Sequence, residues 1–154
     1  ERFSCTEWTV ADLYILGRQD KLLPSIKDIA FGSILHTVQD SFSSSHTQRE
    51  AETSAGFCAG SDQYRKPGRI VEFHSYGSQD GHLHDAEDER TAMVSHVVER
   101  KAEAIAASRM LVDLYRDRRS WSEVKPYVDC LFELSDTAKP SSPGDQYRKA
   151  AKND

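Results

Sequence analysis

The sequence predicts an all-α fold, a multi-helix bundle with one long glycine-rich loop inserted between two metal-ligand helices. Residues 24–42 and 82–118 repeat apolar side chains at the spacing of a helix face. Between them, residues 55–81 contain five glycines and a proline, which are typical of a loop. We therefore expect one helical domain over residues 1–136 and a flexible C-terminal tail over 137–154, where Pro, Ser, Gly and Lys predominate.

The first half of the domain is predicted to contain two helices. The first spans residues 9–17, with Thr9 as its N-cap and Gly17 as its end. Pro24 suits the first turn of the second, which continues to about residue 42. Residues 47–54 are expected to add a helical turn, and within the loop only residues 69–73 predict a short strand.

The second half is predicted to contain the longest helix, over residues 82–118. Its apolar residues recur at helical spacing, with charged residues between them: Met93, Val94, Val97, Val98, Ala102, Ile105, Ala106, Met110 and Leu114. A final helix follows, capped by Ser120 or Ser122 and ending near Phe132, with Pro126 expected in its first turn.

Composition and net charge disfavour two features: a membrane span and a surface for nucleic acid. No apolar run reaches the roughly 18 residues of a membrane span, so we expect no stable span. The net charge of −5 gives no overall basic surface for nucleic acid. Cys5, Cys58 and Cys130 are odd in number and form no Cys-x-x-Cys pair, so one disulfide and three free thiols both remain open.

Two His-x-x-x-Asp pairs are the main functional feature of the sequence. His36 and Asp40 lie four positions apart on one predicted helix, His46 follows six positions later, and His84 and Asp88 repeat the four-residue spacing on the next helix. Residues four apart lie on the same face of a helix, so each pair can hold one metal ion. Imidazole and carboxylate ligands favour zinc. His46, His84 and Asp88 would form a three-ligand zinc site, and His36 with Asp40 half of a second.

These residues allow two other interpretations. The pairs can instead be buried polar networks in a metal-free helical interaction module, since burying an imidazole and a carboxylate requires some compensation. Serine catalysis is disfavoured, because the serines before His46 lie in no Gly-x-Ser-x-Gly turn. His74, His82 and His96 are expected to be surface or packing residues.

The arrangement of His36, Asp40 and His46, followed by His84 and Asp88, resembles the zinc-dependent phospholipase C and single-strand-specific nuclease superfamily. The resemblance covers roughly residues 30–95. It implies an all-helical, secreted or periplasmic phosphodiester hydrolase with two or three Zn²⁺ ions in a complete site. It also implies that Asp40 bridges two zincs, while His46, His84 and Asp88 hold the more exposed one.

The resemblance leaves part of the family's ligand set without a counterpart. Members of the family use an N-terminal Trp, two further histidines and an aspartate upstream of the first motif. Here Glu1 stands first and no histidine precedes His36. The upstream aspartate cannot be chosen among Asp12, Asp20 and Asp28. Another chain or a preceding segment would complete the cluster, or the site has fewer metals.

The substrate expectation is a phospholipid or another phosphodiester. The acidic net charge and the lack of a basic stripe favour a lipid headgroup, which makes phospholipase C the first expectation. A single-strand nuclease or nucleotidase of the same superfamily is the alternative. The residues do not identify a general base.

Overall fold

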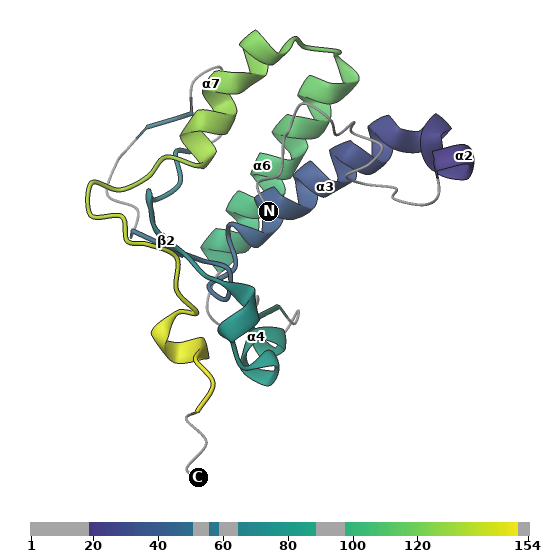
Figure 1. Cartoon of the computed structure of the whole chain (residues 1–154). Coiled ribbons are helices and arrows are strands. Elements are labelled where there is room, and N and C mark those ends of the chain that lie inside the picture. The colour runs from purple at the N-terminus through teal and green to yellow at the C-terminus, as the bar shows by residue number, and fades with distance from the viewer. Residues whose placement is uncertain (1–18, 51–55, 59–64, 89–97, 151–154) are drawn as a thin grey trace. The chain divides into compact units, whose positions relative to one another are not determined.

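The structure is a computed structural model that describes residues 19–50, 56–58, 65–88 and 98–150 (Figure 1). The chain divides into two units, residues 1–37 and 38–154. The predicted helix over residues 9–17 lies outside the described residues.

The first unit contains α2 (Gln19–Leu22), a 3₁₀ turn (Leu23–Ser25) and most of α3 (Ile26–Asp40). Pro24 lies at the start of the 3₁₀ turn. A backbone N–H at this position has no partner within the helix, so the N–H that proline lacks is not needed. The predicted helix over residues 24–42 is confirmed to within two residues at each end. Ser33 and Thr37 donate hydrogen bonds to the carbonyl oxygens of Ile29 and Ser33, at 3.2 and 2.9 Å.

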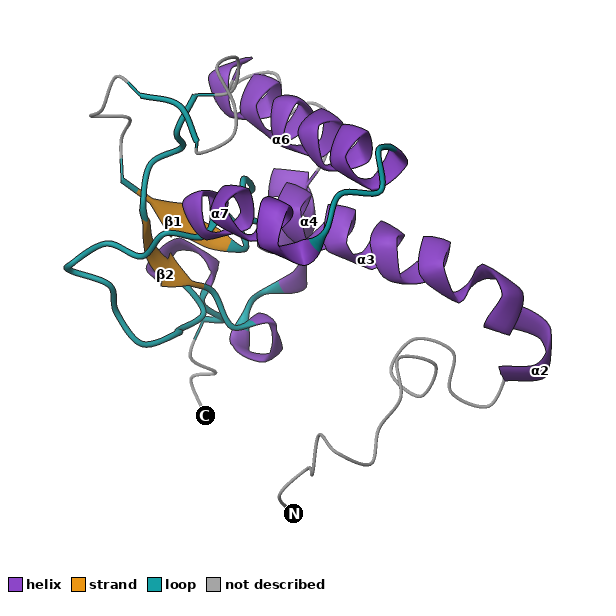
Figure 2. Cartoon of the chain, turned by 90° about the horizontal axis from the view of Figure 1, so that it is seen from above, coloured by secondary structure: helices purple, strands orange, loops and turns teal. Residues whose placement is uncertain are grey.

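A two-stranded antiparallel sheet in the second unit contradicts the all-α prediction (Figure 2). Strand β1 (Thr47–Arg49) pairs with β2 (Ile70–Phe73), with a bulge between Gln48 and Arg49. The short strand predicted over residues 69–73 is confirmed. The helical turn predicted from residue 47 is wrong over Thr47–Arg49, because alternate residues there are buried, as a strand requires. The fold is therefore mixed helix and sheet.

The C-terminal part of the chain extends this sheet by backbone hydrogen bonds. Ile70 N–H donates to the Glu133 carbonyl, and Ser135 N–H donates back to the Ile70 carbonyl, both at 2.8 Å. Further along, Ser75 N–H donates to the Ser142 carbonyl at 2.6 Å. Tyr147, in a 3₁₀ turn (Asp145–Tyr147), is buried. In Figure 1 this yellow-green segment runs beside β2.

Among the residues that the structure describes, the second unit also contains α4 (Gly81–Asp88), α6 (Val98–Arg116) and α7 (Trp121–Leu131). The first two lie within the single helix predicted over residues 82–118, and residues 89–97 between them lie outside the described residues. Ser120 is the N-cap of α7 as predicted, with Glu123 completing a capping box. Pro126 lies in the second turn of α7, not in the first.

The core of the second unit joins these elements. Its buried apolar residues come from the end of α3, from β2, α6 and α7, and from the C-terminal turn: Val38, Phe42, Cys58, Ile70, Ala104, Ala107, Leu111, Tyr127, Leu131 and Tyr147. A disulfide joins Cys58 to Cys130, which resolves the pairing that the sequence left open. Among the described helices, none is long and apolar enough to cross a membrane.

Arg49 is a buried charge within this core. Its guanidinium donates to the carbonyls of Ser41, Gly68 and Leu131 at 2.8, 2.9 and 2.9 Å, and lies 4.8 Å from the centre of the Phe42 ring. These contacts connect the end of α3, the chain before β2 and the end of α7. A single side chain therefore fixes three segments that are far apart in the sequence.

Candidate metal centre

His46 is held at the end of a tight serine-rich turn that follows α3. Ser43 carbonyl accepts the N–H groups of His46 and Thr47 at 3.1 and 3.0 Å. Gln79 Nε2 donates to the Ser45 carbonyl at 2.6 Å, and the His46 carbonyl accepts the N–H of His74 at 2.8 Å. The turn is thus bonded on both sides, which fixes the backbone from which the His46 ring projects.

His84 lies in the first turn of α4. Asp80 caps this helix, because its Oδ1 accepts the N–H of His82 at 2.9 Å. The cap makes α4 begin at Gly81, close to the predicted start. His84 is only 4% exposed, and its Nε2 lies 3.2 Å from Nε2 of His46. The two ring planes are nearly perpendicular, with centroids 4.7 Å apart.

The carboxylate of Asp85 orients the His84 ring. Asp85 Oδ1 lies 3.3 Å from His84 Nδ1, the nitrogen turned away from His46. A carboxylate accepts hydrogen bonds, so this contact favours the tautomer with the proton on Nδ1 and the Nε2 lone pair toward His46. This is the pattern of metal-binding histidines, whose second nitrogen commonly donates to a carboxylate or carbonyl.

The separation of the two Nε2 atoms fits a shared zinc ion. Zinc binds imidazole nitrogen at about 2.0–2.1 Å with tetrahedral angles, which places two such nitrogens about 3.3 Å apart. The 3.2 Å between His46 and His84 is close to that value. The same distance also suits a hydrogen bond from His46 Nε2 to His84 Nε2. The hydrogen bond requires a proton on Nε2 of His46, whereas a bound zinc ion would displace that proton.

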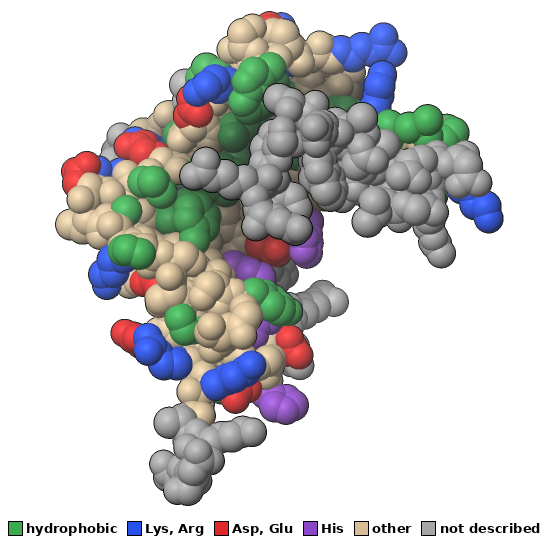
Figure 3. Space-filling model, in the orientation of Figure 1, with side chains coloured by type: hydrophobic (Ala, Val, Ile, Leu, Met, Phe, Trp, Pro, Cys, Tyr) green, Lys and Arg blue, Asp and Glu red, His purple; other side chains and the backbone are tan. Residues whose placement is uncertain are grey.

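An exposed aromatic ring lies against the histidine pair. The Tyr76 ring, in a 3₁₀ turn (Tyr76–Ser78), has its centre 4.5 Å from that of His84 and 6.1 Å from that of His46. Tyr76 is 66% exposed and Leu83 46% exposed. In Figure 3, hydrophobic, histidine, acidic and basic side chains all appear in the lower part of the view, around α4. A ligand at the pair would therefore meet both charged and apolar groups.

Side-chain hydrogen bonds join the serine-rich turn to α4 and to the C-terminal turn. Ser44 Oγ donates to Glu87 Oε2 at 3.0 Å, and lies 2.9 Å from the hydroxyl oxygen of Tyr147. Tyr147 in turn is buried. The serine turn, α4 and the C-terminal turn are therefore bonded to one another beside the two histidines.

Of the five predicted ligands, the structure brings His46 and His84 together. Asp88 ends α4, four residues after His84, and its side chain lies outside the described residues. Asp40 ends α3 and is half-buried, whereas His36 is exposed and belongs to the first unit. Among the side chains that the structure describes, no group of three or more His, Cys, Asp and Glu has the geometry of a metal site.

Two residues beside the pair were not predicted from the sequence. Asp85 fits the ordinary preference for acidic residues in a first helical turn, although its position next to His84 could have indicated a partner for the ring. Tyr76 lies in the predicted loop, and nothing in its spacing indicates that it would reach His84. Comparisons of the chain with family models, with curated proteins and with solved structures found no match.

Proposed function

We propose that this chain is a zinc-dependent phosphodiester hydrolase of the phospholipase C type. The observation that carries the proposal is the His46–His84 pair, with its Nε2 atoms 3.2 Å apart and the outer nitrogen of His84 turned to Asp85. Asp88 would complete this site, as the spacing on α4 predicts. His36 and Asp40 would contribute to a second zinc, whose other ligands a preceding segment or another chain would supply.

Each residue of the pair has a defined task in this proposal. His46 and His84 bind the metal through Nε2, and Asp85 keeps His84 in the required tautomer. A bound zinc supplies a Lewis acid for a phosphate oxygen and a hydroxide near neutral pH. The burial of His84 excludes water from the inner side of the pair, while the exposed Tyr76 side remains open to a substrate.

The exposed apolar residues beside the pair support a lipid substrate. The Tyr76 ring lies against both histidines and is largely exposed, and Leu83, which precedes His84 in α4, is also exposed. Such residues can contact the glycerol and acyl parts of a phospholipid while its phosphate reaches the metal. Tyr76 also supports the second candidate, a single-strand nuclease, because an exposed aromatic ring can stack on an unpaired base.

The experiment compares the two substrate classes with one set of variants. The zinc-loaded chain is given phosphatidylcholine vesicles, with release of diglyceride measured, and single-stranded DNA, with release of nucleotides measured. We expect diglyceride release that is lost in His84→Ala and in Asp40→Asn and kept in His82→Ala. His82 is the matched control, because it is an exposed histidine of the same helix. Nucleotide release alone would favour the nuclease, and full activity of Asp40→Asn would contradict the two-site proposal.

The disulfide supports a secreted or periplasmic location. Cys58 and Cys130 are bonded in the structure, and such bonds persist mainly in oxidising compartments. The remaining candidate is a metal-free interaction module, in which His46 and His84 share a proton. A purified chain with no zinc at near-stoichiometric level would favour that module over the hydrolase.

A further inference from the structure

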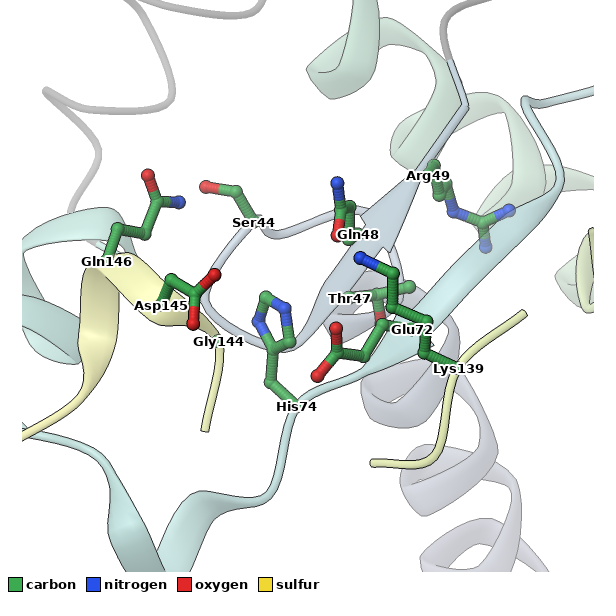
Figure 4. A pocket seen from close by; sticks show the side chains of 10 residues that line it. All are labelled: Ser44, Thr47, Gln48, Arg49, Glu72, His74, Lys139, Gly144, Asp145 and Gln146. Atoms are coloured by element: carbon green, nitrogen blue, oxygen red, sulfur yellow. The ribbon is translucent and has the colours of Figure 1, made fainter. Parts of the chain in front are cut away.

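A polar pocket lies between the sheet and the C-terminal segment, apart from the histidine pair (Figure 4). Its volume is about 430 Å³, within the range of small-molecule sites. Thr47, Gln48 and Glu72 line it from the two strands, and Lys139 and Gly144 from the C-terminal segment. Neither His46 nor His84 lines it, so this pocket is distinct from the candidate metal centre.

Glu72 is a carboxylate where the strand pattern calls for an apolar side chain. Along β2, Ile70 and Glu72 are the buried positions, at 0% and 8% exposure. The Glu72 Oε1 atom is buried and has no hydrogen-bond partner among the described residues. A buried polar oxygen without a partner is destabilising, because it has lost its hydrogen bonds to water. A ligand that donates a hydrogen bond to Oε1 would remove this cost.

The wall opposite Glu72 is kept open by a glycine. Gly144 has φ +76°, a conformation that side chains rarely adopt, and a Cβ there would lie 2.8 Å from Cε1 of His74. The His74 ring is itself fixed, with Nδ1 3.2 Å from the Ser45 carbonyl. Nδ1 therefore donates, and Nε2 is left as an acceptor. A side chain at position 144 would fill space that the ring and the pocket now share.

The pocket is balanced in charge and rich in mixed hydrogen-bonding groups. Its four charged residues are two acids and two bases: Glu72, Asp145, Arg49 and Lys139. The guanidinium of Arg49 donates hydrogen bonds to backbone carbonyls. Amide, hydroxyl and imidazole groups make up much of the rest of the lining: Gln48, Gln146, Ser44, Thr47 and His74. This balance disfavours a ligand with a large net charge and favours groups that both donate and accept.

We propose that this pocket binds a neutral polyhydroxylated ligand, of the size of a monosaccharide or the end of a glycan. One hydroxyl donates to Glu72 Oε1, and its neighbours exchange hydrogen bonds with Lys139, Gln48 and His74. The buried Oε1 of Glu72 has no other partner among the described residues, so Glu72 contributes most to affinity. The proposal does not depend on zinc or on the histidine pair.

The test titrates the full chain with glucose, galactose and mannose, and with their methyl glycosides, which imitate the end of a glycan. Binding is followed by saturation-transfer NMR and calorimetry. We expect millimolar affinity for at least one sugar, reduced about tenfold in Glu72→Gln. Lys139→Met changes an exposed side chain and should also weaken binding without lowering the melting temperature. Glu133→Gln, a carboxylate outside the pocket that pairs with Lys66, should bind like the parent chain.

Three results would overturn the proposal. One is the absence of saturable binding by every sugar, which would mean that only water meets Glu72. Another is tighter binding of inorganic phosphate or glycine betaine than of any sugar. The third is unchanged sugar affinity in both Glu72→Gln and Lys139→Met. Binding of methyl glycosides alone would identify a glycan end, and equal binding of free sugars would identify a monosaccharide.

Discussion

Gly68 occupies a position where the chain leaves no room for a side chain. A Cβ at this residue would lie 2.0 Å from the carbonyl oxygen of Glu50, an approach that no side chain tolerates. We predict that Gly68→Ala destabilises the second unit by about 3 kcal/mol, since backbone on both sides must shift. Gly77→Ala is the matched control, because no described atom lies within 4 Å of its Cβ position. Chemical denaturation of both variants measures the difference, and equal stabilities would contradict this close packing.

Single residues also show what the sequence could and could not predict. The spacing of His46 and His84 indicated a shared site, and the structure places their rings in contact. Whether they bind zinc stays a prediction. The buried Arg49 could not be foreseen, because its acceptors are carbonyls of Ser41, Gly68 and Leu131, and backbone acceptors leave no trace in the sequence.

The cap of α7 is a local element whose contribution can be measured directly. Ser120 and Glu123 form a capping box, with Glu123 Oε2 accepting the N–H of Ser120 at 2.9 Å. We predict that Ser120→Ala lowers stability by about 1 kcal/mol, because the N–H of Glu123 loses the Ser120 hydroxyl as its acceptor. Ser141→Ala, an exposed serine outside any helix, should change stability little. Thermal unfolding followed by circular dichroism compares the two, and the cap would be contradicted by equal melting temperatures.

The end of β1 carries a pH-dependent contribution to stability. The Ser135 hydroxyl and then the Arg69 guanidinium donate hydrogen bonds that hold the pKa of Glu50 below its ordinary value of 4.5. Because the folded pKa is lowered, this stabilisation is complete above pH 4.5 and is lost as the pH falls through the folded pKa. We predict that stability falls more steeply below pH 4.5 in the parent chain than in Glu50→Gln. Denaturation curves over this pH range would refute the assignment if the two profiles were parallel.

The sequence predicts helices α3 and α7 but not strand β1, and the reason is physical. Helices α3 and α7 follow from local spacing and capping, which the sequence contains within a few residues. Strand β1 has only three residues, and its pairing with β2 depends on a partner more than 20 residues away. No local pattern distinguishes such a strand from a helical turn. The all-α prediction was wrong at this point.

At the scale of the whole molecule, the disulfide that the structure describes joins two parts of the second unit that are far apart in the sequence. The Cys58–Cys130 disulfide closes a separation of 72 residues. Closing such a loop stabilises a fold by about 4 kcal/mol, because it restricts the unfolded chain. We predict that Cys130→Ser and Cys58→Ser each lose a stability of this size, because each variant removes the same bond. Denaturation with and without reductant checks this, and a parent chain insensitive to reductant would contradict it.

The central claim is that His46 and His84 bind one zinc ion. The most direct measurement is calorimetric titration of the metal-free chain with Zn²⁺, repeated for His46→Ala, His84→Ala and the control His82→Ala. The account predicts that each variant of the pair loses at least about tenfold in affinity for the same site, while the control binds like the parent. Equal zinc binding by all four proteins, or no binding by the parent chain, would contradict it.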